Sequence, residues 1–455
     1  MSLAMNRANA QPADGLTLVV GLGLTGLTCA RFLAARGEAF AVADSRANPP
    51  GLDELRREFP QVEVYLGEFD RDLFGRAARL LLSPGVAPQE HAVLEAQQAG
   101  VEVLGDIELF ARHAAAPVVA ITGSNGKSTV TALLGAMAQQ AGKSVLVGGN
   151  IGTPALALLD EPVPQLYVLE LSSFQLEVTR SLNCLAATVL NLSDDHLDRH
   201  HSMENYAAIK ARIYAGDGVM VINADDPRVA AMAEAQRNVV RFSLAPPQRE
   251  QDYGVRHHNG VDYLARGSEL LLPASAMRMP GRHNQANALA ALALGEAAGL
   301  SLAAMLDPLR SYPGLPHRCQ WVATLDGVDY YNDSKGTNVG ATLAALEGMP
   351  GEKVVLIAGG QGKGQDFSPL RERVARRARG VILIGEDAPL LAQALAGVDG
   401  VIFAATMEQA VGMARAAAQP GDSVLLSPAC ASFDMFNNYA ERGDAFVAAV
   451  REGMT

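Results

Sequence analysis

The segment Thr122–Thr129, with the sequence Thr-Gly-Ser-Asn-Gly-Lys-Ser-Thr, constrains the fold of this chain more than any other. The apolar run Val118–Ile121 before it indicates a buried strand, and the apolar-periodic segment Val130–Ala141 after it indicates a helix. A glycine-rich turn between strand and helix lets backbone N–H groups surround a phosphate at the positive end of the helix. Within such a turn, Lys127 would reach the terminal phosphates and Ser128 would ligate magnesium. We therefore predict a phosphate-binding loop in an α/β domain.

This loop departs from the general phosphate-loop pattern in one place. Ile121 stands where that pattern has its first glycine, so the loop is a shortened variant anchored by Gly123 and Gly126. The alternative is a tight turn before an ordinary helix. The Gly-Lys-Ser sequence at a strand–helix junction favours phosphate binding.

Length and composition limit the remaining possibilities. A chain of 455 residues predicts about three domains, and 49% hydrophobic residues can fill several cores. The net charge of −12 argues against general binding to nucleic acid or to acidic membranes. Four cysteines without a CxxC pair indicate a reducing compartment and no zinc framework. The N-terminal residues 1–14 contain no apolar signal region, so we expect a soluble cytoplasmic protein without a membrane span.

A second glycine motif lies near the N-terminus. The strand-like run Leu16–Val20 leads into Gly21–Gly26, with the pattern GxGxxG, and a helix is predicted from Leu27. A second strand, Ala39–Ala43, ends at Asp44, which suits a dinucleotide-binding fingerprint. The motif alone is weak evidence for NAD, because any nucleotide diphosphate can use the same helix N-terminus and close helix–strand packing needs glycines too.

Polar side chains follow the strands predicted in the next domain. In a parallel sheet such strand ends meet at one edge, where ligands bind. The carboxylate of Glu170 would suit a magnesium ion bound to a triphosphate. The alternative is that it is a solvated charge at the end of a strand. His196 would face the same edge, or it is a capping or core histidine. A zinc site built from the neighbouring histidines and aspartates lacks cysteines, so the sequence favours it least.

The predicted helix Met203–Tyr214 carries a lysine in an unusual place. Tyr206, Ile209 and Tyr214 belong to an apolar stripe at helical spacing, and Lys210 lies within it. A lysine on a core-facing stripe seldom lacks a partner. Lys210 either snorkels at the edge of the stripe or faces the active site, there with a chemically modified amine.

The rest of the chain predicts a second ligand-binding edge. The amides of Asn284 and Asn287 open an alanine-rich helix, where they could read an adenine edge or cap the helix. The turn-rich segment 309–316 leads into a further alternation of strands and helices. Polar and glycine-rich runs again follow the strands, at Asn332–Asn338, Gly359–Gly364 and Ser427–Asp434.

Taken together, these motifs resemble the Mur ligase family, bacterial amide ligases of peptidoglycan precursor synthesis. The resemblance runs almost end to end and rests on Gly21–Gly26, Thr122–Thr129, Gly149–Gly152, Glu170–Glu177, Asp195–Asp198, Gly314–Arg318, Asn332–Lys335 and Leu426–Asp434. The shortened phosphate loop is also what this family has. The Gly21 stretch, Gly359–Phe367 and Ser427–Phe436 point to the D-glutamate-adding member, and the recognition motif of the diaminopimelate- or lysine-adding relative is not found.

The resemblance implies a three-domain α/β fold. A Rossmann-like UDP-substrate domain would cover residues 1–105, a central ATPase-type parallel-sheet domain residues 106–313, and a Rossmann-like amino-acid-binding domain residues 314–455. It implies an ATP-dependent ligase, a monomer, that uses two magnesium ions. The enzyme would join D-glutamate to UDP-N-acetylmuramoyl-L-alanine through an acyl phosphate.

The resemblance also implies roles for individual residues. ATP would be held by the loop residues Gly123, Ser124, Asn125, Gly126, Lys127, Ser128 and Thr129, and its nucleoside by Asn284, Asn287, Arg318 and Asp333. The magnesium ligands would be Ser128, Glu170, His196 and a carbamylated Lys210. The UDP substrate would contact Leu24, Thr25, Asp44, Ser45, Arg46, Asn150, Ser172 and His196. D-glutamate would meet Thr337, Lys363, Ser432, Phe433 and Tyr439, with His317 and Lys335 near the reacting groups.

Three alternatives remain beside this hypothesis. A folylpolyglutamate-type ligase shares the ATP-site layout but not the uridine-type first domain. An NAD-dependent oxidoreductase built on Gly21–Gly26 leaves Lys127, Glu170 and Lys210 unexplained. A catalytically silent nucleotide-binding scaffold would not need every ligand type that this chain retains.

Overall fold

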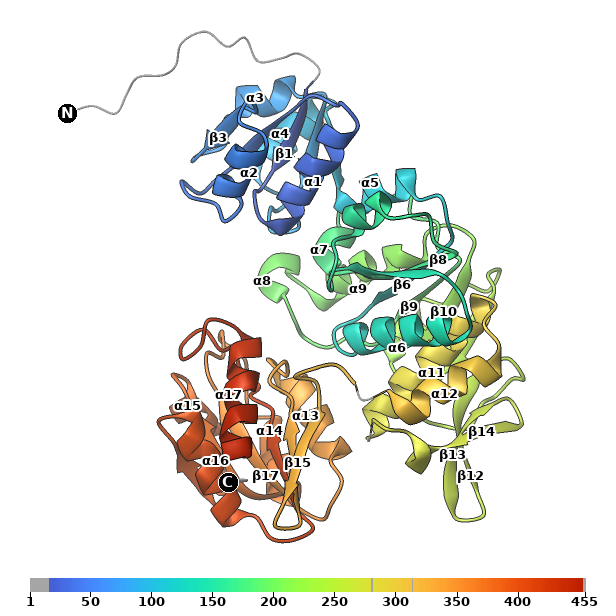
Figure 1. The fold of residues 1–455 in the computed structure, drawn as a ribbon, viewed down its shortest axis with the longest axis vertical. Coiled ribbons are helices and arrows are strands. Elements are labelled where there is room, and N and C mark those ends of the chain that lie inside the picture. The colour runs from blue at the N-terminus through green and yellow to red at the C-terminus, as the bar shows by residue number, and fades with distance from the viewer. Residues whose placement is uncertain (1–15, 280, 313, 453–455) are drawn as a thin grey trace, which may run out of the picture. The chain divides into compact units, whose positions relative to one another are not determined.

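A computed structural model describes residues 16–279, 281–312 and 314–452, so the prediction for residues 1–14 lies outside the described residues (Figure 1). The chain forms two compact units. Among the described residues, the first contains 16–123, 143–220 and 231–239, and the second contains 124–142, 221–230, 240–279, 281–312 and 314–452.

The first sheet has five parallel strands in the order β3-β2-β1-β4-β5. Its strands are β1 (Thr17–Val20), β2 (Phe40–Asp44), β3 (Val64–Leu66), β4 (Arg79–Leu82) and β5 (Glu102–Gly105). Its helices are α1 (Leu24–Ala35), α2 (Leu52–Glu58), α3 (Arg71–Arg76) and α4 (His91–Gln98). All four residues of β1 are buried, as its continuous apolar sequence predicts. The helix predicted from Leu27 begins at Leu24, so its first turn contains residues that we expected in the glycine turn.

The second sheet has nine strands in the order β14-β13-β12-β11-β10-β9-β6-β8-β7. They are β6 (Val118–Thr122), β7 (Val145–Gly149), β8 (Leu166–Glu170), β9 (Ala186–Val189), β10 (Val219–Asn223), β11 (Val239–Phe242), β12 (Tyr253–His258), β13 (Val261–Arg266) and β14 (Glu269–Pro273). In the first unit, β7, β8, β6 and β9 pair in parallel, so their carboxyl ends share one edge. That edge carries the polar residues that the sequence predicted to follow these strands.

The last three strands of this sheet, which belong to the second unit, are antiparallel. Strands β12, β13 and β14 form successive hairpins. Asn259 and Gly260 make the first turn, with φ angles of 51° and 78°, and both residues are exposed. Two positive φ angles are typical of the tight turn that suits the twist of a hairpin.

The helices around the second sheet complete its layers. They are α5 (Asp106–His113), α6 (Lys127–Gln140), α7 (Ser173–Leu176), α8 (Leu197–His200), α9 (Met203–Ala211), α10 (Pro227–Ala230), α11 (Arg282–Ala297) and α12 (Leu302–Ser311), with short 3-10 turns η1 (Ala155–Asp160), η2 (Arg212–Tyr214) and η3 (Ala274–Ala276). Within the second unit, α6 packs against α11 and α12, as Figure 1 shows. The predicted alanine-rich helix is therefore present as α11, which is far more buried than α12.

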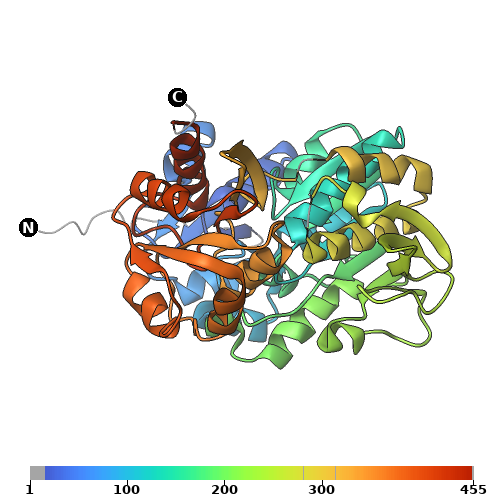
Figure 2. The ribbon, with the colours of Figure 1, turned by 90° about the horizontal axis from the view of Figure 1, so that it is seen from below.

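The third sheet has six strands in the order β15-β16-β20-β17-β18-β19, of which only β15 is antiparallel to its neighbour. The strands are β15 (Gln320–Leu325), β16 (Val328–Asn332), β17 (Val354–Gly359), β18 (Ala378–Ile384), β19 (Val401–Phe403) and β20 (Ser423–Leu426). The helices are α13 (Val339–Gly348), α14 (Leu370–Arg377), α15 (Ala388–Ala394), α16 (Met407–Ala417) and α17 (Tyr439–Glu452). Successive residues of β17 enter two different cores, one with α13 to α15 and one with α16 and α17, so helices cover both faces (Figure 2).

The three sheets with flanking helices confirm the predicted α/β fold class. Within the described ranges, no helix combines the length and the apolar character needed to span a bilayer.

Candidate active site

The phosphate loop joins the end of β6 to the start of α6. Gly126, directly before the helix, has a φ of 83°, a left-handed conformation that favours glycine. The helix begins at Lys127 rather than at the predicted Val130, because the polar loop residues supply its first turn. Lys127 Nζ donates to the Ser124 carbonyl at 2.9 Å, so the ammonium group curls back over the loop. This is the geometry of a loop that presents N–H groups and one cation to an anion.

Two pairs of residues predicted to bind ATP are in contact within the second unit. The Arg318 guanidinium donates to the Ser128 hydroxyl at 2.7 Å. Asn284 and Asn287, which open α11, are buried, and Asn287 Nδ2 donates to Asn284 Oδ1 at 3.2 Å. The amides therefore already engage each other, and their contact with adenine stays a prediction.

Glu170 stands at the carboxyl end of β8, where its backbone pairs in register with Ile121 of β6. Its side chain is only 3% exposed, and Asn150 Nδ2 donates to Oε1 at 2.8 Å. Its other oxygen, Oε2, is buried without a hydrogen-bond partner among the described residues. An unsatisfied buried carboxylate oxygen is costly, and a hard cation is the partner that suits it.

Lys210 reaches the same strand ends from α9. The side chain is 1% exposed, which confirms that the helical stripe faces the core. Nζ donates to Thr122 Oγ1 and to the Gly123 carbonyl, both at 3.1 Å, and lies 4.8 Å from the centre of the Tyr206 ring. The amine of Lys210 is thus held at the beginning of the phosphate loop.

His196 directly precedes α8 and has a left-handed backbone, with a φ of 53°. Its ring packs edge-on against Phe174 at 4.8 Å, and Nε2 lies 3.7 Å from Asp195. Within the described part of the chain, no group of three or more His, Cys, Asp or Glu side chains is gathered for a metal ion, so nothing there supports the zinc alternative. The predicted magnesium ligands are a mixed set in which Glu170 Oε2 offers the free acceptor.

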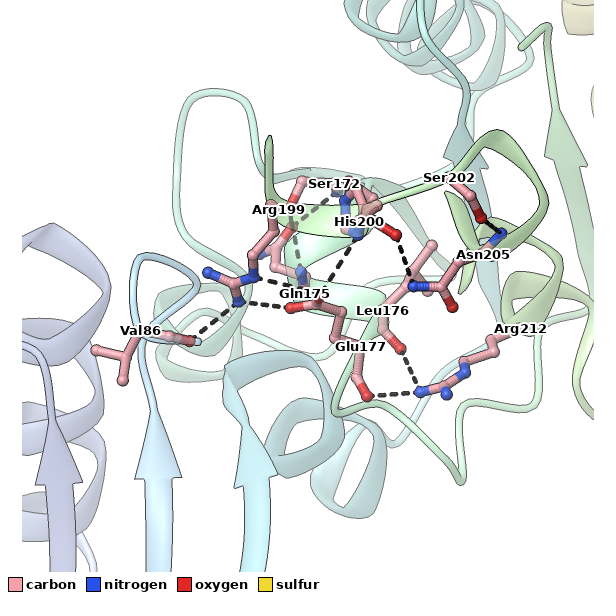
Figure 3. A network of polar contacts seen from close by, with 11 residues as sticks. Val86, Ser172, Gln175, Leu176, Glu177, Arg199, His200, Ser202, Asn205 and Arg212 are labelled. Atoms are coloured by element: carbon pink, nitrogen blue, oxygen red, sulfur yellow. Dashed lines mark hydrogen bonds and ion pairs between the residues drawn. The ribbon is translucent and has the colours of Figure 1, made fainter. Parts of the chain in front are cut away.

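A polar network surrounds α7 and α8 in the first unit (Figure 3). Arg199 donates to the Val86 carbonyl at 3.1 Å and pairs with Glu177 at 2.5 Å. Ser172 caps α7, since its Oγ accepts from the Gln175 N–H while the Gln175 side chain accepts from the Ser172 N–H. The Ser172 hydroxyl thus has a structural role, and its predicted substrate contact stays a prediction.

The residues predicted to hold the UDP substrate surround the first glycine turn. Leu24 is 67% exposed at the start of α1, and Ser45 is exposed after β2. Asp44 is buried and accepts from the Leu22 N–H at 2.6 Å and from the Arg46 guanidinium at 2.7 and 2.8 Å. These hydrogen bonds, with that from the Arg46 N–H, hold the pKa of Asp44 below its usual value despite burial, which raises it. The Asp44 carboxylate therefore shapes the turn, while Arg46 keeps a half-exposed side chain.

A cluster in the third sheet's layer brings three predicted residues together. Lys335 Nζ lies 3.8 Å from the centre of the Tyr439 ring, and the Lys335 N–H donates to the His317 carbonyl at 3.0 Å. His317 has a φ of 62°, and its Nδ1 lies 3.0 Å from Asn332 Nδ2. Burial lowers the pKa of His317, and the neighbouring Lys335 charge lowers it further, so the neutral ring is favoured.

A second group follows β17 and β20. Lys363, with a φ of 53°, places Nζ 5.5 Å from the Phe433 ring, which is 63% exposed. Ser432 is buried beside it in the chain, and the Thr337 carbonyl accepts from Gln365 Nε2 at 3.5 Å. A cation above an exposed ring suits an acidic ligand, as predicted for D-glutamate.

Asp333 is a buried acid in the same layer. Its Oδ1 accepts from the Cys319 N–H at 3.1 Å, and its Oδ2 accepts from Ser427 Oγ at 2.7 Å. Burial raises the pKa of Asp333 to about 6. These contacts tie Asp333 to the chain itself, so its predicted contact with the nucleoside stays a prediction.

Comparison with known proteins decides the family. Residues 121–295 match the Mur ligase middle domain, residues 16–105 the MurD-like N-terminal domain of Mur ligases, and residues 317–430 the glutamate ligase domain. A protein of Nitrosococcus oceani, named UDP-N-acetylmuramoylalanine–D-glutamate ligase, is 56% identical over 444 residues, covering 97% of this chain and 98% of that protein. A Pseudomonas fluorescens protein of the same name is 54% identical over 443 residues, with coverage of 97% and 98%.

The chain belongs to the Mur ligase family. The predicted family and ligase class are thereby confirmed. Among solved structures, MurF ligase from Thermotoga maritima in complex with ADP aligns over 97% of this chain and 96% of that one, with a TM-score of 0.59 and 18% identity. That likeness supports the fold of a Mur ligase.

Reasoning from the sequence missed one residue of this Mur ligase that organises the predicted D-glutamate region. Arg442 on α17 is 1% exposed and makes five hydrogen bonds, to Ser334 Oγ and to the carbonyls of Ser334, Gly359, Cys430 and Ala431. The sequence does contain a signal. Arg442 lies four residues before Phe446 and eight before Val450, so all three would share one helical face. The same argument that singled out Lys210 would have found it.

Proposed function

We propose that this Mur ligase joins D-glutamate to UDP-N-acetylmuramoyl-L-alanine and converts ATP to ADP and phosphate. The observation that carries the proposal is near full-length identity of 56% and 54% to two proteins that bear the corresponding name. The phosphate loop and the first glycine turn would supply the two nucleotide-binding elements that such a reaction needs.

The chemistry explains why ATP is required. A carboxylate is a poor acyl donor, so its oxygen first attacks the γ-phosphorus and ADP leaves. The amine of D-glutamate then attacks the acyl phosphate, loses a proton and expels phosphate to form the amide. Negative charge develops on phosphoryl and carbonyl oxygens, and the Lys127 ammonium with the N-terminus of α6 would stabilise it.

Magnesium would bind through Ser128, Glu170, His196 and Lys210. The buried Glu170 Oε2, which has no hydrogen-bond partner among the described residues, fits a hard cation. A bare lysine offers no acceptor, whereas a carbamate on Lys210 would supply two oxygens and a negative charge. Bound magnesium would neutralise phosphate charge, and the protein would fix its ligands in place.

Recognition of D-glutamate would fall to the third sheet's layer. Lys363 presents a cation near Phe433, and Lys335 presents another near Tyr439. With Thr337 and Ser432 they would hold the two carboxylates, while the neutral His317 would lie near the attacking amine. The UDP moiety would bind at Leu24, Thr25, Ser45 and Arg46, and Asn150 would lie along the muramoyl group.

We also propose the domain limits 1–105, 106–313 and 314–455, a monomer, and a cytoplasmic location. The matched family segments, 16–105, 121–295 and 317–430, support the division. Four free thiols suit a reducing compartment.

Phosphate release tests the proposed function directly. Turnover should require ATP, UDP-N-acetylmuramoyl-L-alanine and D-glutamate together, and Lys127→Ala should lower kcat by roughly 10³-fold. Lys143→Ala, just beyond the other end of α6, serves as the control and should keep normal turnover. Release of phosphate without D-glutamate, or near-normal activity of Lys127→Ala, would contradict the proposal.

Binding measurements separate this proposal from the oxidoreductase alternative. Titration with UDP and with NADH should give saturable binding of UDP alone. Arg46→Ala should weaken UDP by about tenfold, the effect of one charge-assisted hydrogen bond. Saturable NADH binding without UDP binding would favour the oxidoreductase.

A further inference from the structure

A hollow of about 790 Å³ lies within the first unit, apart from every residue discussed for substrate or nucleotide binding. One wall comes from α4, β5 and the loop before α4. The other comes from the segment after α7, from η2 and from the loop before β11. Its volume falls in the range of small-molecule sites.

The second wall is cationic. Arg180, Arg212 and Arg237 line it, and none of them forms an ion pair within the part of the chain that the structure describes. Arg212 Nη1 donates to the Glu177 carbonyl at 2.5 Å, as Figure 3 shows. Arg237 donates to the carbonyls of Tyr214 and Gly218 at 3.1 and 2.9 Å. The guanidinium groups of Arg212 and Arg237 are thus positioned by backbone carbonyls, which leave their charge uncompensated.

One donor in this wall lacks any partner. Arg237 Nε is buried and makes no hydrogen bond to the described residues. The Arg212 guanidinium donates hydrogen bonds to the described residues only from Nη1, so its other nitrogens remain able to donate. A guanidinium group offers five donors in a planar fork that matches phosphate oxygens.

The acidic residues of the hollow do not neutralise this wall. The Glu177 carboxylate is already engaged by Arg199 at 2.5 Å and lies 3.4 Å from His200. Glu234 is exposed. The facing wall is uncharged and presents Leu94 and Val103 with two glutamine amides. Three arginines against a neutral wall make a local positive field in a chain of net charge −12.

We propose that this hollow is an oxyanion-binding site that takes the phosphate or diphosphate group of a small molecule. The group accepts hydrogen bonds from Arg180, Arg212 and Arg237, and the organic part lies against the neutral wall. The site adjoins the network of Figure 3, because Arg212 donates to the carbonyl of Glu177 and the Glu177 carboxylate pairs with Arg199 on α8. Occupancy therefore acts on the segment that carries His196, and the site is regulatory rather than catalytic.

Calorimetric titration with pyrophosphate tests the proposal. The enzyme is first saturated with ADP and UDP, which fill the two proposed nucleotide sites, in buffer with EDTA. One further pyrophosphate should bind per chain. Arg180→Glu should weaken that binding by about tenfold or more, because it replaces a charge-assisted donor with a repelling charge. The Arg180 side chain is exposed and makes no hydrogen bond to the described residues, so the fold should be retained.

Arg56→Glu, an exposed arginine on α2, is the matched control and should bind pyrophosphate as the parent does. Arg237→Gln, which keeps polar hydrogen-bonding capacity but loses the charge, should weaken binding by several-fold. Crystals soaked in tungstate should show anomalous density at the three arginines. Absence of a further pyrophosphate site, equal affinity in Arg180→Glu and parent, or tungstate bound elsewhere would overturn the proposal.

Discussion

Among the residues that the structure describes, the two most deeply buried lysine and arginine side chains, Lys210 in the first unit and Arg442 in the second, are held in different ways. Both side chains are 1% exposed. Lys210 Nζ meets a hydroxyl and a carbonyl at the start of the phosphate loop, close to strand ends that also carry the half-satisfied Glu170. Arg442 spreads five hydrogen bonds over a serine hydroxyl and four carbonyls, and the described residues contain no ion pair to it.

The difference indicates that a buried cation can serve either to hold the structure or to take part in chemistry. The planar guanidinium of Arg442 links the chain segments at the ends of β16, β17 and β20. Its hydrogen bonds therefore serve to hold the structure. Burial lowers its pKa to about 10, which still leaves it protonated at neutral pH. Lysine has a compact ammonium group whose reactivity changes readily on burial. Lys210 therefore suits a chemical role, and Arg442 a role in holding three loops in the region proposed to bind D-glutamate.

Replacing Lys210 should have the largest effect. We expect Lys210→Ala to lower kcat by roughly 10³-fold, because it removes the proposed carbamate oxygens from the metal site. Acetate at high concentration should restore part of the activity by filling the vacated place. Steady-state phosphate release measures both effects. Lys127→Ala serves as the control, since acetate cannot replace a cation there.

The reciprocal change sharpens this test. Lys210→Arg keeps the positive charge but cannot carry a carbamate, so it should be as inactive as Lys210→Ala. Full activity in Lys210→Arg would mean that residue 210 acts as a cation, as Arg442 does. The proposed carbamate on Lys210 would then be wrong.

Replacing Arg442 should mainly affect stability and the third sheet's loops. Arg442→Met leaves buried carbonyls unsatisfied and should lower the free energy of unfolding by about 3 kcal/mol. The KM for D-glutamate should rise several-fold while the KM for ATP stays within about twofold, because Gly359, Cys430 and Ala431 belong to the loops assigned to D-glutamate. Urea unfolding and initial rates give the two readouts.

Arg451, exposed on the same helix, provides the matched control. Arg451→Met should change the free energy of unfolding by less than about 0.5 kcal/mol. A similar small effect for Arg442→Met would show that its five hydrogen bonds contribute little, and Arg442→Lys would then be equally tolerated.

A buried acid in the first unit provides the smallest test. Asp106 accepts from Gln175 Nε2 at 2.9 Å, but its Oδ1 has no partner among the described residues. Burial raises the pKa of Asp106 to about 6, so the folded state binds this proton more tightly than the unfolded state. Stability should therefore fall as pH rises from about 4 to 6 and stay lower above pH 6.

Asp106→Asn removes that ionisation and keeps an acceptor for Gln175. At pH 8 the variant should be more stable than the parent by up to about 3 kcal/mol, and at pH 4 the two should differ little. Thermal unfolding across this pH range checks the sign, with the exposed Asp160→Asn as the control. A parent whose stability rises between pH 4 and 6 relative to Asp106→Asn would contradict a raised pKa.

Much of the fold could be predicted because its strands are buried on both faces. The continuous apolar runs that became β1, β8 and β17 carry that signal. The short strand β3 was missed because its three residues are only partly buried, and β19 because two of its three are exposed. Both helix starts were placed three residues late, since glycine and hydroxyl residues form the first turns of α1 and α6.

Some features of the candidate site could likewise be predicted from the sequence, and others could not. Types and positions of residues such as Lys127 and Glu170 follow from motifs at strand ends. The left-handed backbones of His196 and His317, however, depend on contacts between distant segments and have no local sequence signature. Asp44 and Ser172 show why the role of a polar residue is hard to predict from a motif alone. Each lies beside a predicted ligand-binding motif, but its side chain forms hydrogen bonds that stabilise a turn or cap a helix.

The hairpin turn at Asn259 and Gly260 offers a practical handle on this enzyme. Both residues are exposed, and the flanking strands β12 and β13 pair with each other through six residue pairs up to the turn. An exposed turn of this kind tolerates inserted residues better than any packed segment. A fluorophore or an affinity peptide placed between Asn259 and Gly260 would therefore give an engineered reporter or purification form that leaves the strand ends carrying the phosphate loop untouched.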